Sequence, residues 1–163
     1  MGIHNPEAHP STDLRYLRSL RVEETPFAPS TPLPLRMFSS DWLTRLQSTI
    51  NDDPELGVIG DWFTLAMSLS SESERCVLRF ERGRLVQTIA TPRLDTPCAF
   101  GFRATADIWR RFFADPPEPL YHDIFAMLMR VPGFVLEGDS LVAMQHARAL
   151  HRAMRVLRTV SPS

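Results

Sequence analysis

The clearest hydrophobic pattern of the sequence lies close to its C-terminus. Apolar residues recur there at helical spacing and predict an amphipathic helix over residues 140 to about 160. The preceding residues, 134–137, predict a short buried strand, followed by a turn at Gly138 and an N-cap at Asp139. The apolar face of the helix consists of Ala143, Ala147, Leu150, Met154 and Leu157, flanked by Val142, Ala149, Ala153 and Val156. We therefore expect this helix to cover the rest of the domain with one face and to meet solvent with the other.

Four more strands are predicted upstream. Residues 61–70 alternate between apolar and polar side chains, which indicates a half-buried strand. Residues 75–82 and 84–91 predict two strands of a hairpin that turns at Gly83. Residues 98–104 predict the fourth strand, with two phenylalanines on one side.

Helices are predicted before and after these strands in the sequence. One begins near Ser39 to Asp41 and carries an apolar face of Trp42, Leu43, Leu46 and Ile50. Two more cover residues 106–114 and 120–130, separated by a proline-rich break. The order is helix, four strands, two helices, strand and helix. It predicts an α+β fold, with a five-stranded, mostly antiparallel sheet covered on one face by helices.

The first 37 residues differ in composition from the rest. Six of the 14 prolines lie in residues 1–37, where they favour extended backbone. Leu14, Leu17 and Leu20 predict one short helix, which is too short to be stable alone. We expect an arm at 1–37 that docks on its own domain, on a second copy in a homodimer, or on a partner, and a folded domain at 38–160.

Composition and charge exclude several functional classes of protein. Hydrophobic residues make up 44% of the chain and charged residues 23%, as in ordinary globular proteins, and the formal net charge of −1 gives no attraction to nucleic acid. Cys76 and Cys98 fit no metal spacing and are expected to be free thiols, and the five histidines show no ligand spacing, so no metal or cofactor is expected. The sequence shows no apolar run long enough to span a bilayer and no signal peptide, so we expect a cytoplasmic protein.

These elements resemble those of the sterol carrier protein 2 (SCP2) family over residues 38–157. The resemblance rests on the opening helix with Trp42, the strand that begins Asp-Trp-Phe at 61–63, the hairpin at Gly83, the helix with Trp109, and Leu-Glu-Gly-Asp at 136–139 before the last helix. It implies an apolar tunnel between sheet and helices that holds fatty acyl chains, sterols or other lipids, and it implies no catalysis. The proline-rich arm and the final residues, which are no peroxisomal signal, depart from the pattern. They favour a bacterial, cytoplasmic relative, and some of these resemble accessory factors that present quinone precursors to enzymes.

The tunnel is expected between the sheet and the helices at 106–114, 120–130 and 140–160. Aromatic and methionine side chains crowd this part of the sequence, which fits either an ordinary core or an adaptable cavity. His146 falls in the apolar half of the last helix, either as a core histidine or as a polar contact for a ligand head group. The expected lining is Phe80, Phe100, Phe102, Trp109, Phe112, Phe125, Met129, Phe134, His146, Leu150 and Met154.

Two other features have competing interpretations. Residues 138–141, Gly-Asp-Ser-Leu, match the nucleophile block of one esterase class, but no acidic residue follows and His146 and His151 lie on the same helix as Ser140. An N-cap is the favoured interpretation, and an esterase the alternative. The basic face of the last helix, with Arg148, Arg152 and Arg155, is either a solvated face or a contact for a membrane surface or a partner enzyme. A protein-interaction module with a filled core is the alternative to a lipid carrier.

Overall fold

The structure, a computed structural model, describes residues 1–2 and 36–162. The chain divides into two units, Met1–Leu33 and Pro34–Ser163, and every element named below belongs to the second. The arm predicted at 1–37, with its short helix and its proposed role in a homodimer, lies almost wholly outside the described residues.

Five strands of the described chain form one sheet in the order β3-β2-β1-β4-β5. β1 and β4 run parallel, whereas the other three neighbouring pairs are antiparallel. The strands are β1 (Leu65–Ser70), β2 (Arg75–Glu81), β3 (Arg84–Ile89), β4 (Phe100–Arg103) and β5 (Val135–Gly138). The predicted α+β class and mostly antiparallel sheet are therefore confirmed.

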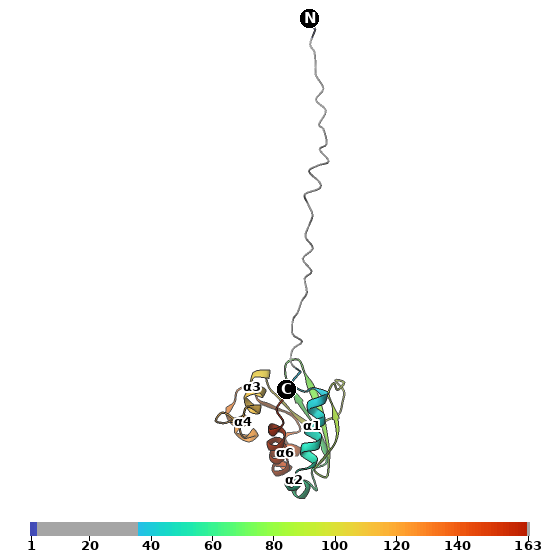
Figure 1. The fold of residues 1–163 in the computed structure, drawn as a ribbon, viewed down its shortest axis with the longest axis vertical. Coiled ribbons are helices and arrows are strands. Elements are labelled where there is room, and N and C mark those ends of the chain that lie inside the picture. The colour runs from blue at the N-terminus through green and yellow to red at the C-terminus, as the bar shows by residue number, and fades with distance from the viewer. Residues whose placement is uncertain (3–35, 163) are drawn as a thin grey trace. The chain divides into compact units, whose positions relative to one another are not determined.

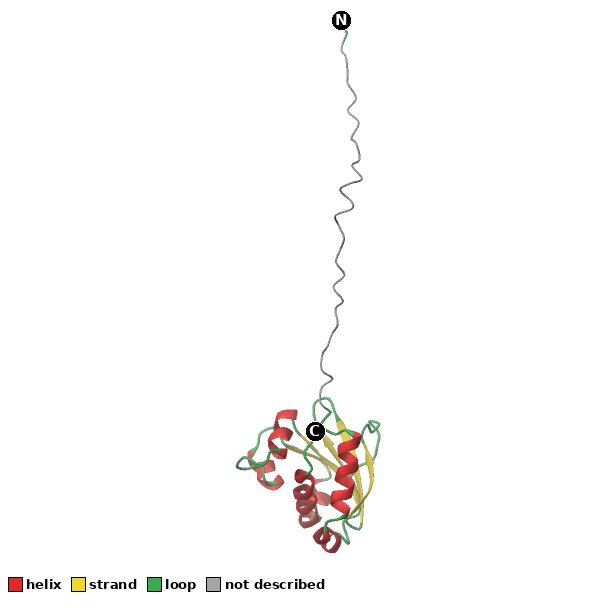
Figure 2. Cartoon of the chain, viewed as in Figure 1, coloured by secondary structure: helices red, strands yellow, loops and turns green. Residues whose placement is uncertain are grey.

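Helices cover one side of this sheet, as Figure 2 shows. α6 lies beside α1 in Figure 1, with α3 and α4 beyond it, and it also contacts α2 and α5. The last helix is thus the element on which the other helices pack. The helices are α1 (Ser40–Asn51), α2 (Pro54–Ile59), α3 (Ala106–Phe113), α4 (Ile124–Arg130), α5 (Ser140–Gln145) and α6 (Ala147–Thr159).

Side-chain caps explain where several helices begin. The hydroxyl of Ser39 accepts a hydrogen bond from the backbone N–H of Trp42 at 3.2 Å, and Thr105 caps α3 in the same way. The carboxylate of Asp139 accepts from the N–H of Val142 at 3.0 Å, so the predicted cap after β5 is confirmed. These residues satisfy N–H groups that the first turn of a helix leaves without a backbone partner.

Two helices differ from the prediction. α2 was not predicted, because Asp-Pro at 53–54 suggested only the end of α1; Asp53 instead caps a second helix that has Pro54 in its first turn. α4 begins at Ile124 and not at residue 120, because the Asp123 carboxylate accepts from two backbone N–H groups of its first turn, while Leu120 has a left-handed φ of 77°.

The single helix predicted over residues 140–160 is two helices, α5 and α6. His146 separates them with φ −104° and ψ 20°, which is outside helical geometry. The hydrogen bonds still continue across the junction, because the N–H of His146 donates to the Val142 carbonyl and its own carbonyl accepts from Leu150. The junction therefore interrupts the helix at His146, while both backbone groups of that residue stay hydrogen-bonded.

The two faces of the sheet differ in what covers them. On the inner face, apolar side chains of β1, β2 and β4 are buried under the helices. On the outer face, the connection from β3 to β4 must pass β2 and β1, and Arg75 of β2 donates hydrogen bonds to Arg93 and Cys98 within it. Ser68 also faces this side, where a Cβ on Gly101 would lie 2.0 Å from its hydroxyl, so only glycine fits there.

Candidate functional site

The space between the inner face of the sheet and the helices is the candidate site. It is formed by long-range packing, because strands β1, β2 and β4 supply its floor and α3, α4 and α6 its roof. Eight of the eleven predicted lining residues are buried in one apolar cluster: Phe80, Phe100, Phe102, Trp109, Phe112, Phe134, Leu150 and Met154. The structure thus brings these residues together from several elements that are far apart in the sequence.

Aromatic rings occupy the centre of this space. The rings of Phe102 and Phe134 stack with centroids 5.4 Å apart, and Trp109 meets Phe134 edge to face at 5.7 Å. The indole N–H of Trp109 donates to the backbone carbonyl of Ser70 at 2.9 Å, so its polar group is satisfied inside the cluster. In this structure the predicted tunnel residues fill the space by contacting one another.

His146 borders the same apolar cluster. Its ring lies edge to face on Phe63 with centroids 5.7 Å apart, and the residue is half-buried. Within the described residues the ring makes no hydrogen bond, so neither nitrogen is committed to a backbone carbonyl. This leaves a polar group at the edge of an apolar interior.

α4 is held against α6 by a short polar contact. The His151 imidazole Nε2 lies 2.6 Å from the Asp123 carboxylate, and the His151 ring stacks on half-buried Phe125. Burial of Asp123 raises the pKa of this carboxyl, but the hydrogen bonds from the Ala126 N–H and from His151 outweigh that effect and leave the pKa below its ordinary value. Asp123 therefore both caps α4 and positions it.

Met129 was predicted to line the tunnel, and the structure shows that it does not. Its side chain is 79% exposed and lies outside the apolar cluster. Because α4 starts at Ile124, its buried face is formed by Ile124 and Met127. Met129 was placed inside because aromatic and methionine side chains crowd this part of the sequence.

The prediction of a basic, solvent-facing side on the last helix is also wrong at one position, Arg152. Arg152 binds Asp53 with two hydrogen bonds of 3.1 and 2.6 Å and contacts Glu55 at 2.9 Å. The hydrogen bond from Arg152 holds the pKa of Asp53 below its ordinary value, more than burial raises it. Arg148 and Arg155 are exposed, as predicted, but Arg152 is part of the contact between α2 and α6. No sequence signal pointed to this contact, because α2 was not predicted.

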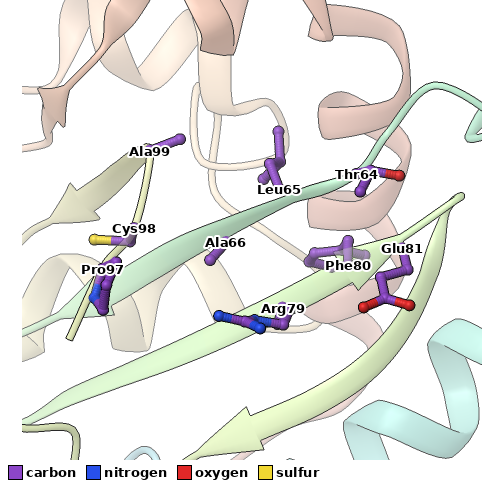
Figure 3. A pocket seen from close by; sticks show the side chains of 9 residues that line it. All are labelled: Thr64, Leu65, Ala66, Arg79, Phe80, Glu81, Pro97, Cys98 and Ala99. Atoms are coloured by element: carbon purple, nitrogen blue, oxygen red, sulfur yellow. The ribbon is translucent and has the colours of Figure 1, made fainter.

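A hollow lies where β1 begins, and Figure 3 shows its lining. It has a volume of about 350 Å³ and combines apolar groups with the charged side chains of Arg79 and Glu81 and the thiol of Cys98. Phe80 is the residue that it shares with the predicted tunnel. Sequence reasoning missed this hollow, because the loop that carries Cys98 is placed on the outer face only by the order of the strands.

The residues considered for an esterase or a metal site do not form one. Ser140 is exposed at the start of α5, while His146 lies at the end of that helix against Phe63. Among the described residues, no group of three or more His, Cys, Asp or Glu side chains could hold a metal ion. In the same part of the chain, no helix has the length and hydropathy needed to cross a membrane.

The fold is identified by comparison with solved structures that have the same arrangement of helices and strands. A crystal structure of sterol carrier protein 2 superposes with a TM-score of 0.63 over 77% of this chain and 99% of that one, at 17% sequence identity. The chain has the SCP2 fold. The five-stranded sheet covered by helices, which the resemblance implied, is therefore confirmed.

Two further SCP2-like structures match over similar lengths. One is a conserved hypothetical protein from Thermus thermophilus, described as possibly a sterol carrier protein, with a TM-score of 0.58 and 16% identity over 79% of this chain and 92% of that one. The other is the ubiquinone synthesis protein UbiJ-SCP2, with a TM-score of 0.50 and 14% identity over 80% and 95%. No family model and no curated protein sequence matches the chain. At these identities the likeness establishes the fold.

Proposed function

We propose that this SCP2-like domain binds a lipophilic small molecule, such as a fatty acyl chain, a sterol-like or an isoprenoid lipid, and carries or presents it without catalysis. One observation carries the proposal: the fold is that of a sterol carrier protein, and the face of the sheet that its helices cover is apolar along β1, β2 and β4. A long apolar ligand needs such a surface more than it needs polar groups.

The energetics favour this ligand class. Burying about ten methylene groups contributes roughly 8 kcal/mol, at ~0.8 kcal/mol each. Before the costs of immobilising the ligand, this corresponds to a dissociation constant on the order of 1 µM. The half-buried ring of His146 is then available to a polar head group at the edge of the interior.

Entry of a ligand requires side chains to repack, because those of the interior contact one another. Met127 and Met154 are well suited to this, since a methionine side chain adapts its shape at little cost. The contact between Asp123 and His151 joins α4 to α6, and the non-helical residue His146 joins α5 to α6. We propose that α4 and α5 move away from α6 to admit the ligand.

The first test is native mass spectrometry of protein purified without detergent. We expect a mass increase that corresponds to co-purified lipid, together with saturable uptake of a fluorescent fatty acid. Replacement of Met154 by Trp puts a larger side chain into the buried cluster, and we expect uptake to fall at least about tenfold, because repacking can then clear less space for the lipid chain. Leu150→Trp should act in the same way.

Arg148→Trp is the matched control, because it adds the same ring at an exposed position of the same helix. It should bind the fatty acid as the wild type does. A clean mass of the unliganded protein, with no uptake of the fatty acid by the wild type, would overturn the proposal whether or not the Trp variants fold.

A second candidate is an accessory or protein-interaction module with a permanently filled core. The ring contacts among Phe102, Trp109 and Phe134 favour it, because they already give the interior a solid packing. The likeness to a ubiquinone synthesis protein supports an accessory role beside a lipid-related enzyme in either case. Absence of lipid and of uptake, with a partner enzyme captured by the purified protein, would favour this second function.

A further inference from the structure

A groove between α1 and α6 carries charged groups that the proposed lipid binding does not use. It has a volume of about 420 Å³ and lies on the solvent side of the two helices. Its lining comprises Thr49, Asp52, Asp53, Pro54, Arg152, Arg155, Val156, Arg158 and Thr159. The three arginines recur every third residue of α6, so they share one side of the helix.

The three arginines differ in what they bind. Arg152 is neutralised, because Asp53 and Glu55 both contact its guanidinium within 3 Å. Arg155 and Arg158 have no carboxylate within 4 Å and no side-chain hydrogen bond among the described residues. The Nε of Arg158 is buried and without a partner, which is costly for a charged N–H donor.

The charge balance of the lining favours a small anion. Arg152 is set aside together with Asp53 and Glu55, which both bind it. Within the lining, Arg155 and Arg158 then face Asp52 alone, and the Asp52 carboxylate already accepts a weak hydrogen bond from Ser48. The hydroxyl groups of Thr49 and Thr159 donate to backbone carbonyls of their own helices and supply no donor to the groove. Binding would therefore come from two guanidinium groups and would suit a ligand of about one negative charge.

We propose that this groove binds a phosphate group through Arg155 and Arg158. Guanidinium groups pair with phosphate oxygens through parallel hydrogen bonds, and two of them on one helix side can share one phosphate. The phosphate belongs either to a phospholipid head group at a membrane surface or to a soluble phosphate ester. The site is separate from the apolar interior, and the inference does not depend on the proposed lipid binding.

The test measures binding of the full chain to phosphatidylcholine vesicles that contain phosphatidylglycerol, with pure phosphatidylcholine vesicles as reference. Titrations with inorganic phosphate and with glycerol phosphate form the soluble arm. We expect Arg155→Gln and Arg158→Gln each to weaken binding about fivefold, as one arginine near an anionic surface contributes. The double variant should lose binding more than tenfold, and added salt should weaken the wild type.

Arg148→Gln is the matched control, because Arg148 is exposed, lies two turns from Arg155 on α6 and does not line the groove. It removes the same charge and should change binding by less than twofold. Arg155 is exposed, so Arg155→Gln keeps the test valid if Arg158→Gln fails to fold.

Each outcome either identifies the source of the phosphate group or rejects the phosphate site. Binding to phosphatidylglycerol vesicles alone assigns the groove to a lipid head group, and binding of the soluble esters assigns it to free phosphate. No binding in either arm overturns the proposal, and so does an equal loss in Arg148→Gln, which would indicate diffuse attraction by the basic helix. Uptake of a fluorescent fatty acid should stay unchanged in all these variants.

Discussion

At the scale of single residues, the two cysteines show how surroundings decide reactivity. Cys76 points into the core from β2 and is fully buried, and this burial raises the pKa of its thiol to about 12. Cys98 is half-buried in the connection to β4, where its sulfur accepts a hydrogen bond from the Arg75 guanidinium at 3.2 Å. The reactive form of cysteine is the thiolate, so the two should differ sharply.

We therefore predict that iodoacetamide modifies Cys98 and spares Cys76 in the native protein. Intact-mass measurement should show one adduct in buffer near pH 8, close to the ordinary thiol pKa of about 8.5, and two adducts in denaturant. The Cys98→Ser variant should show none until it unfolds. Modification of both thiols in the native wild type would contradict the assigned burial of Cys76.

At the scale of elements, one carboxylate positions the short helix α2. Asp53 caps it through the Leu56 N–H at 2.7 Å and also binds Arg152 of α6, with a side chain only 9% exposed. A helix of six residues is not stable alone, so this double contact accounts for its formation.

The pH dependence of this contact follows from the lowered pKa of Asp53. A carboxyl whose folded-state pKa lies below its ordinary value of 3.8 stabilises the fold at higher pH and loses that contribution as pH falls through the folded pKa. We predict that Asp53→Asn lowers the free energy of unfolding by about 1 kcal/mol near neutral pH. The difference from wild type should shrink below about pH 4, measured by urea denaturation at several pH values.

Asp52→Asn is the control for this experiment. Asp52 is exposed and accepts only a 3.4 Å hydrogen bond from Ser48. Its change should stay within about 0.5 kcal/mol at every pH, as for most surface substitutions. A loss at Asp53 that persisted undiminished in acid would mean that packing, and not the charge, is responsible.

At the scale of the whole domain, one hydrogen bond joins its first and last helices. The indole N–H of Trp42 on α1 donates to the backbone carbonyl of Val160, just after α6, at 2.5 Å. Both residues are buried, and the Trp42 ring also packs against Phe38 and Phe113. The contact closes the domain between segments 118 residues apart.

We predict that Trp42→Phe lowers the free energy of unfolding by about 1–3 kcal/mol, since the buried Val160 carbonyl loses its donor. Chemical denaturation should show a lower midpoint with an unchanged slope. Trp62→Phe is the matched control, because Trp62 is 84% exposed, and it should unfold as the wild type does. Equal stability of the two variants would show that the Trp42 hydrogen bond contributes nothing.

Local patterns in the sequence sufficed for most elements. The alternation around Met67, the turn at Gly83 and the caps at Asp139 and Thr105 each depend on residues within a few positions, so the strands and several helix starts could be predicted. Eight of the eleven residues proposed for the tunnel are buried in one cluster for the same reason: apolar periodicity identifies the faces that avoid water.

Features that depend on contacts between residues far apart in the sequence could be found only from the tertiary structure. The six-residue helix α2 exists because Arg152, about a hundred residues away, binds its cap, and the crossing loop places Cys98 on the outer face because of the strand order. The sequence alone determined the class of fold and most of the side chains that face inward, since both follow from local periodicity. Only the tertiary structure decided the break in the helix at His146, the exposure of Met129 and the groove with Arg155 and Arg158, because each depends on how separate elements pack.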